Sequence, residues 1–308
     1  MNGVPCMTMP TPHLEKIKAA IENAKLPAKD RGRLREAVKR YHAWIVAMRA
    51  VAGSPEEMVT QLVSLMNEYK LHFDMDLIFD SSEDFLYRQK GQLKLDNSII
   101  EEFLPWIVRP PILPGLTPDV QVGPAPCYSD LYFESALGRP GVGGEPKVRD
   151  KAQDFAVARK IFIRTSYHPS FEGIASRQAC IAYVAAEIKT NLDKTMFQEA
   201  CATAHDVKSA VAGSRYFLLC EWLDMTPLST SGTDINEVLI LRGKRLAANV
   251  REHFSTLDGR RRHRDQYEKY LKDRPFRADV LMRFVRHIGR LLTDDTPLED
   301  DAVARGFF

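Results

Sequence analysis

The hydrophobic and polar positions follow a helical period at both ends of the chain and a strand-like pattern between them. Apolar residues recur every three or four positions from about Leu14 to Ala52 and again over residues 55–73, which is typical of amphipathic helices. Ser54 followed by Pro55 predicts the start of the later helix, because serine caps a helix and proline suits its first turn. We therefore expect a helical region over residues 13–105, after a disordered arm at residues 1–12.

The middle of the chain has a different pattern. Pro and Gly are dense over residues 106–150, which predicts a largely irregular connection. Branched and aromatic residues then predict strands over 154–167, 179–189 and 216–223. Residues 194–211 return to the helical period, and Gly213 is placed to end that helix. This order predicts an α/β fold, with a mixed central sheet flanked by helices, inside a core that spans residues 151–308.

The last third of the chain reads as helical and basic. Residues 251–290 hold 12 Lys or Arg against 6 Asp or Glu, although the whole chain carries a net charge of only +2. One interpretation is a solvated helical surface with ion pairs one turn apart. The other is contact with DNA, since arginine neutralises phosphates and can read guanine. The candidates for that contact are Arg260, Arg261, Arg262 and Arg264, which cannot all face one partner on a helix.

Cysteine use and hydropathy limit the class of protein. The five cysteines are scattered and lack CxxC spacing, which argues for a reducing compartment and against a zinc site or a disulfide framework. No apolar run approaches the ~18 residues that a membrane-spanning helix needs, and no signal peptide opens the chain. We therefore expect a soluble, cytoplasmic protein without a membrane partner.

The stretch "YVAAEIK" (183–189) ends an apolar strand with an acid and a base. Glu187 and Lys189 share one face, because alternate residues of a strand point the same way. Asp154 opens the preceding strand and could lie beside them. Two carboxylates bind Mg²⁺ when water and phosphate oxygens complete its octahedron. The metal then activates a water, and a lysine stabilises the charge that develops on the phosphate. The pattern indicates phosphodiester hydrolysis; a surface ion pair is the competing interpretation.

Longer strings add a resemblance to a known family. "QDFAVARKIFIRTSY", "AYVAAEIKTNLDKTMFQEACATAHDVK" and "YFLLCEWLDMTP" resemble the PD-(D/E)xK nuclease core and, within it, the type II restriction endonucleases grouped with Bpu-ten-I. The resemblance implies that Asp154 is the first acid of the motif, Glu187 the second and Lys189 its lysine. Asp154 follows Gln153 instead of proline and lies 33 positions before Glu187. Other acids that could take its place are Glu172, Asp150 and, in the following helix, Glu199.

The resemblance also implies a function. It suggests Mg²⁺-dependent hydrolysis of double-stranded DNA at a short site, interrupted or asymmetric, with the metal held by Asp154 and Glu187. Cutting two strands with one centre per chain favours a homodimer or a heterodimer with a related subunit. A DNA methyltransferase is expected in the same restriction–modification system. Two alternatives remain open: a structure-dependent nuclease of DNA repair or recombination, and a DNA-binding protein without catalysis.

Overall fold

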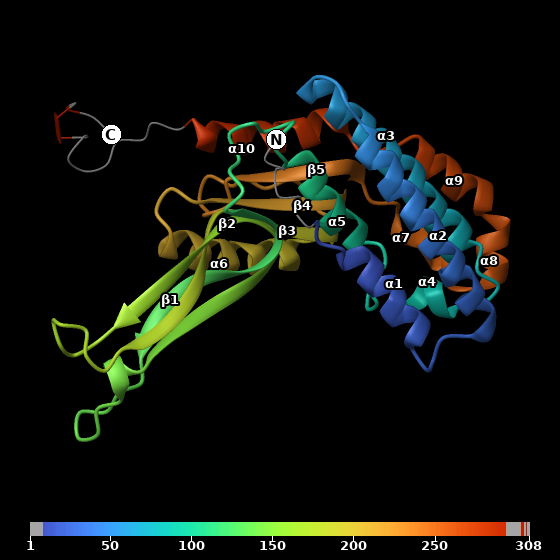
Figure 1. Cartoon of the computed structure of the whole chain (residues 1–308). Helices are drawn as coiled ribbons and strands as arrows, with labels where there is room; N and C mark the ends of the chain where they lie inside the picture. The colour runs from blue at the N-terminus through green and yellow to red at the C-terminus, as the bar shows by residue number, and fades with distance from the viewer. Residues whose placement is uncertain (1–8, 294–302, 305, 307–308) are drawn as a thin grey trace.

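A computed structural model describes residues 9–293, 303, 304 and 306 of the chain. Most helices gather at one side of the molecule, and a sheet with a long arm forms the other side (Figure 1). The helices are α1 (Pro12–Glu22), α2 (Ala28–Ala50), α3 (Pro55–His72), α4 (Phe85–Gln89), α5 (Ser98–Ile107), α6 (Lys194–Ala210), α7 (Ala248–Glu252), α8 (Leu257–Arg262), α9 (Arg264–Lys272) and α10 (Ala278–Leu292). The strands are β1 (Val120–Phe133), β2 (Pro146–Thr165), β3 (Ala175–Leu192), β4 (Arg215–Leu223) and β5 (Glu237–Lys244).

The N-terminal helices form where the helical period predicts them. Ser54 caps α3 through a capping box, in which its side chain accepts the N–H of Glu57 and the Glu57 carboxylate accepts the N–H of Ser54 at 2.9 Å. Every residue of α5 is buried, so this helix lies inside the molecule between the other helices and the sheet. Residues 1–8 of the expected disordered arm lie outside the described residues.

The five strands form one sheet in the order β1-β2-β3-β4-β5. The β1–β2 and β2–β3 pairs are antiparallel, and β3–β4 and β4–β5 are parallel, so the expected mixed sheet is confirmed. The expectation that residues 106–150 are largely irregular is wrong, because β1 lies within them. Its prolines, Pro124 and Pro126, are tolerated because β1 is an edge strand and its register shifts between Gly123 and Ala125. The division into domains remains a prediction.

The two faces of the sheet pack against different helices. Phe155, Val184, Ile188 and Phe217 belong to the large core that α1–α5 and α10 share with one face. Ala156, Ala185, Tyr216 and Leu218, which alternate with them along the strands, pack on the other face with residues of α6. This alternation explains why the strands read as apolar on both faces.

Strand β2 folds back so that its two ends come close together. A straight strand of 20 residues would be about 65 Å long. Arg177, which pairs with Ile163 near the end of β2, nevertheless donates its Nε–H to the carbonyl of Pro146 at its start, at 2.7 Å. The hairpin tips at residues 134–145 and 166–174 therefore lie side by side at the end of the arm (Figure 1).

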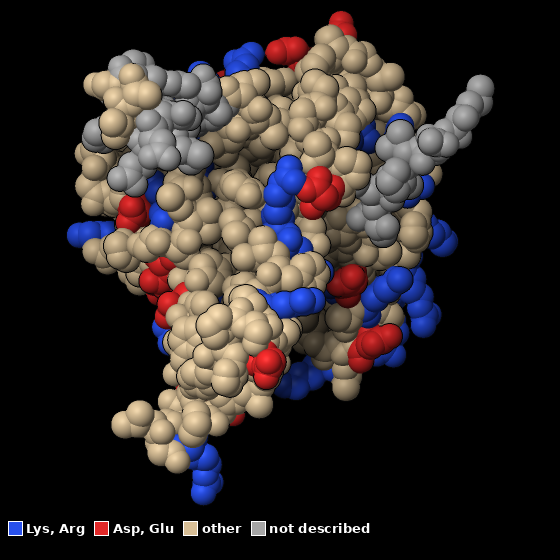
Figure 2. All heavy atoms as spheres, turned by 60° about the vertical axis from the view of Figure 1, so that its left-hand side comes forward, with Lys and Arg blue, Asp and Glu red and all other residues tan. Residues whose placement is uncertain are grey.

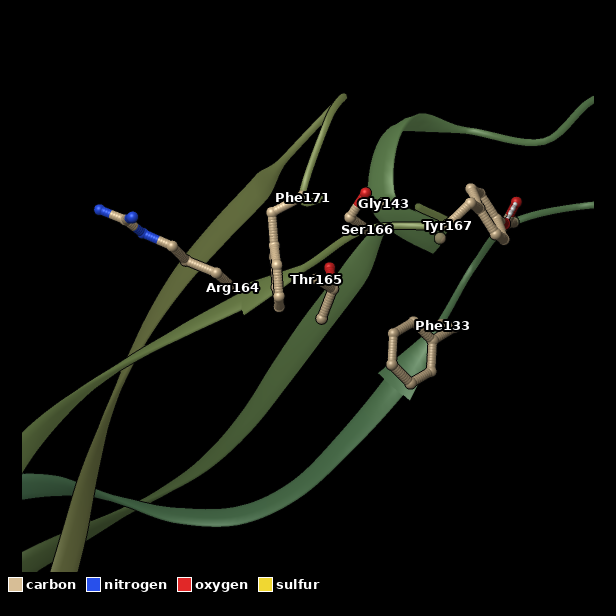
Figure 3. A pocket seen from close by; sticks show the side chains of 9 residues that line it. Phe133, Gly143, Arg164, Thr165, Ser166, Tyr167 and Phe171 are labelled. Atoms are coloured by element: carbon tan, nitrogen blue, oxygen red, sulfur yellow. Dashed lines mark hydrogen bonds between the residues drawn. The ribbon is translucent and has the colours of Figure 1, made fainter. Parts of the chain in front are cut away.

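The two tips enclose a shallow pocket of about 460 Å³ (Figure 3). Phe133, Tyr167 and Phe171 line it and are each more than half exposed. Gly143 allows the tips to approach, because its φ is +57° and a Cβ there would lie 2.4 Å from the carbonyl oxygen of Thr165.

None of the helices in the described part of the chain is long and apolar enough to cross a membrane. The four cysteines among the described residues are free. They are Cys127, Cys180, Cys201 and Cys220.

Candidate active site

Asp154 lies where the pairing of β2 with β3 ends and its pairing with β1 shifts in register. The β2–β3 ladder ends at the pair Phe155–Ala186, and the β1–β2 register shifts between Gly123 and Ala125, opposite Asp154. Such bulges bend a strand and free its backbone groups from the ladder. The Asp154 carboxylate takes the place of a strand partner here, since its Oδ2 accepts the N–H of Ile188 at 2.9 Å.

Glu187 and Lys189 lie on β3 beside this gap. Lys189 Nζ lies 2.6 Å from Glu187 Oε1, and both side chains are 24% exposed. The buried Tyr216, on β4, donates its hydroxyl to Glu187 Oε2 at 3.2 Å. The structure therefore brings Asp154, Glu187 and Lys189 together at one point that remains open to solvent. An isolated surface ion pair between Glu187 and Lys189 would not need the second carboxylate.

The other acids considered from the sequence lie elsewhere. Glu172 is exposed in the hairpin tip at residues 166–174, where its carboxylate accepts the hydroxyl of Ser170. Asp150 is exposed on β2 opposite Tyr128, and Glu199 is exposed on α6. Within the described part of the chain, no hydrogen bond or ion pair joins any of the three acids to Glu187. Asp154, whose carboxylate accepts the N–H of Ile188 and whose pKa the charge of Glu187 raises, is the acid that the fold places beside Glu187.

Helix α5 and the turn before it contribute groups that the sequence reasoning missed. Asn97 donates from Nδ2 to the carbonyl of Ile188 at 3.1 Å and to Glu101 Oε1 at 3.2 Å. Lys94 Nζ lies 3.8 Å from Asp154 Oδ1. The signal that could have pointed here is "IIEEFLPWI", where two acids interrupt an apolar helix.

Burial and mutual repulsion destabilise the negative charges at this point. Burial raises the pKa of Asp154; the N–H of Ile188 and Lys94 oppose this rise, and Glu187 adds to it. Burial, followed by the charge of Asp154, raises the pKa of Glu101 to about 7. A cation bound between these groups would relieve both effects.

A buried network holds α5 against α1 and α2. Glu102, the neighbour of Glu101, accepts the N–H of His13 at 2.9 Å and the hydroxyl of Tyr41. His13 in turn contacts Ser98 Oγ and the hydroxyl of Tyr69, each at 2.9 Å. His13 and Ser98 resemble a nucleophile and its base, but both are fully buried, so they serve to fix α5 and with it Asn97 and Glu101.

The donor chemistry at this point fits Mg²⁺. Asp154 and Glu187 offer carboxylate oxygens, the hard ligands that this ion prefers. Asp154 Oδ1 accepts no hydrogen bond that the structure shows, and the buried Oδ1 of Asn97 has no hydrogen-bond partner. No three His, Cys, Asp or Glu side chains of the described residues are grouped closely enough to hold a metal by themselves. Water or phosphate oxygens would therefore have to complete the coordination shell.

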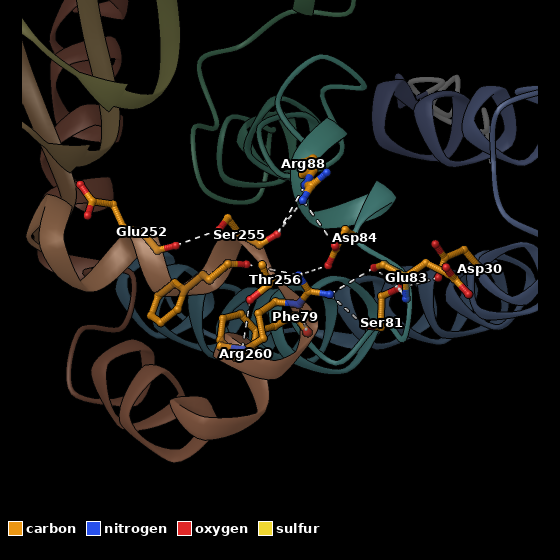
Figure 4. Close-up of polar contacts among 12 residues, drawn as sticks. Asp30, Phe79, Ser81, Glu83, Asp84, Arg88, Glu252, Ser255, Thr256 and Arg260 are labelled. Atoms are coloured by element: carbon orange, nitrogen blue, oxygen red, sulfur yellow. Dashed lines mark hydrogen bonds and ion pairs between the residues drawn. The ribbon is translucent and has the colours of Figure 1, made fainter.

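The arginines expected to contact DNA behave differently from one another. Arg260 is 1% exposed, and its guanidinium is used entirely within the chain, so it is unavailable to DNA (Figure 4). Its acceptors are Asp84 Oδ1 and the carbonyls of Phe79, Ser81, Glu83 and Phe254. Arg264 lies 2.8 Å from Asp80 and 2.6 Å from Glu268. Arg261 and Arg262 are exposed and remain candidates for DNA contact.

The charged surface is mixed in sign where the arm comes forward. Figure 2 shows acidic and basic side chains interspersed over that face, with much of the foreground uncharged. This face therefore shows no broad basic patch that would indicate a DNA-binding surface.

Comparison with known proteins agrees with a nuclease fold. A chain of the native BbvCI A2B2 tetramer superposes with a TM-score of 0.55 at 18% identity, covering 92% of this chain and 98% of that chain. This likeness shows the fold of a restriction enzyme, with a five-stranded sheet flanked by helices. The sequence model of the Bpu10I restriction endonuclease family matches residues 92–308, so the chain belongs to that family. No curated protein matches the chain.

Proposed function

We propose that this protein is a type II restriction endonuclease that hydrolyses double-stranded DNA at a short specific site with Mg²⁺. Membership of the family supports nuclease activity. The observation that carries the mechanism is the meeting of Asp154, Glu187 and Lys189 where β2 and β3 separate.

Each residue has a separate task in this mechanism. Asp154 and Glu187 would hold Mg²⁺, which supplies Lewis-acid stabilisation of the phosphate and lowers the pKa of a bound water. Lys189, already held by Glu187, keeps a positive charge beside the position where negative charge develops on the phosphate. Tyr216 fixes the second oxygen of Glu187, and Asn97 fixes the carbonyl of Ile188, so the strand end keeps its shape when DNA arrives.

Two chains would act together. One such centre cuts one strand, so hydrolysis of both strands calls for two centres. The similar structure is a tetramer with two kinds of subunit. We therefore propose that this chain works as a homodimer or with a related subunit, and that a DNA methyltransferase protects the same site in the cell.

The test is to incubate the purified chain, alone and with any subunit that copurifies, with phage and plasmid DNA in Mg²⁺ or in a chelator. Discrete fragments that appear only with Mg²⁺ are expected. Smears or cuts only at branched junctions would favour a repair nuclease, and DNA binding without cleavage would contradict the proposed activity.

A further inference from the structure

Lys94 has a backbone conformation that few residues adopt. It lies in the turn between α4 and α5 with φ +51°, and only two other non-glycine residues of the described chain, Glu145 and Phe171, have a positive φ. Non-glycine residues avoid this left-handed region, and where they adopt it the surrounding structure must enforce it. Strain of this kind is concentrated at functional sites, so the position of the side chain needs an explanation.

The turn is held firmly enough to enforce the strain. The N–H of Lys94 bonds to the carbonyl of Gly91 at 3.0 Å, and the carbonyl of Lys94 accepts the N–H of Ser98 at 3.2 Å. The next two residues, Leu95 and Asp96, are buried. The backbone therefore fixes the direction in which the lysine leaves the turn.

That direction leads to the candidate active site. Lys94 Nζ lies 3.8 Å from Asp154 Oδ1, too far for a hydrogen bond but close enough for the two charges to attract each other. Asp154 Oδ1 is the carboxylate oxygen that the N–H of Ile188 does not use. Lys94 is 52% exposed whereas Asp154 is 22% exposed, so the ammonium group faces the carboxylate on one side and solvent on the other.

We propose that Lys94 is a phosphate-binding lysine beside the catalytic Lys189, and that it holds the DNA backbone next to the phosphate that is cut. The inference rests on the proposed nuclease function. Lys189 pairs with Glu187, and Lys94 lies beside Asp154. Each of the two carboxylates therefore has its own ammonium group. In DNA-free protein, Lys94 balances the charge of Asp154. When DNA approaches from the solvent side, its ammonium meets the neighbouring phosphate without moving the backbone.

The unusual backbone allows variants that remove the charge without disturbing the fold. Glycine adopts a φ of +51° freely and asparagine tolerates it, so Lys94→Gly and Lys94→Asn should keep the turn without backbone strain. Lys94→Arg keeps the charge. Lys39→Ala is the matched control, since Lys39 is 76% exposed on α2 and pairs only with Glu36 in the described structure.

The experiment measures binding of a short fluorescent duplex in chelator over a series of salt concentrations. The duplex carries the mapped cleavage site, or an arbitrary sequence if no site is found. Lys94→Gly and Lys94→Asn should make the negative slope of log affinity against log salt less steep by about 0.9, the value for one phosphate contact, while Lys94→Arg and Lys39→Ala keep the wild-type slope. Melting temperatures of all variants are measured alongside.

The proposal is overturned if Lys94→Gly and Lys94→Asn keep the wild-type salt slope, whether or not their melting temperatures fall. This outcome leaves the nuclease function standing, because wild-type cleavage with Mg²⁺ is scored separately. If the wild type binds DNA but never cuts it, the nuclease proposal fails while the slope still decides whether Lys94 contacts phosphate.

Discussion

Arg260 offers a test that separates a structural arginine from one that contacts DNA. Its side chain is almost fully buried and donates to Asp84 and to four main-chain carbonyls. Through these bonds Arg260 joins the C-terminal helices to the segment after α3, where Phe79 lies 181 positions away in the sequence. Replacing Arg260 with alanine would leave the whole set of acceptors without its donor.

The expected cost follows from that burial. Asp84 is 33% exposed and can be solvated, so the cost comes from the carbonyls that lose their donor. A buried acceptor left unpaired costs about 1–3 kcal/mol, so losing several together should destabilise the protein by about 3–5 kcal/mol. At roughly 2–4 °C per kcal/mol for a domain of 150–250 residues, this corresponds to a fall in melting temperature of roughly 6–20 °C. The neighbouring Arg261 is exposed, so Arg261→Ala should change stability by no more than about 0.5 kcal/mol.

The assay is thermal unfolding followed by circular dichroism, together with DNA binding measured well below the melting temperature of each variant. We expect Arg260→Ala to unfold early and yet, while folded, to bind DNA with the wild-type salt dependence. Equal melting temperatures for Arg260→Ala and Arg261→Ala would refute the structural role of Arg260. So would a less steep salt dependence of DNA binding by folded Arg260→Ala, which is the mark of a lost phosphate contact.

Three further outcomes are expected. Asp154→Asn should slow cleavage by more than about 100-fold, because losing a residue that merely supports a metal ligand already costs up to about 100-fold. Cleavage within tenfold of wild type would contradict the role of Asp154 as a metal ligand. Tyr216→Phe should raise the Mg²⁺ concentration for half-maximal cleavage by about 10–100-fold with little change at saturation, because Glu187 loses a hydrogen bond; an unchanged Mg²⁺ titration would count against this. Glu101→Gln should raise the melting temperature more at pH 8 than at pH 4.5, because the pKa of Glu101 is about 7 in the folded chain against 4.5 ordinarily, so the wild type loses stability as pH rises between these values. Equal shifts at the two pH values would show that Glu101 is not the group that titrates.

Local patterns predicted much of the sheet and half of the site. The strands after residue 150 show as apolar runs, and the alternation of a strand is enough to place Glu187 and Lys189 on one face. The expectation that Asp154 opens its strand is wrong, because β2 begins at Pro146 and Asp154 lies in the interior of that strand. The alternation of apolar and polar residues does not predict that the β2–β3 ladder ends at Phe155. That end leaves the Asp154 carboxylate free to accept the N–H of Ile188 on β3.

The groups that were missed depend on packing between distant segments. Asn97 bonds to Ile188 across 91 positions of sequence, and no local pattern carries such a contact. Strand β1 was missed because Pro and Gly usually interrupt strands, whereas an edge strand accepts them where it needs no N–H donor. Arg260 was misread because a run of basic residues does not reveal which of its members faces inward.

The most direct measurement of the central claim is single-turnover cleavage of phage DNA by Lys189→Ala in Mg²⁺, with binding of the same DNA followed in parallel. Lys39→Ala is the control for loss of an exposed lysine. If Lys189 stabilises charge at the phosphate, its removal lowers the rate by about 10²–10³-fold while binding and the melting temperature stay close to wild type. A Lys189→Ala variant that cuts as fast as Lys39→Ala would contradict the assignment of this site as the catalytic centre.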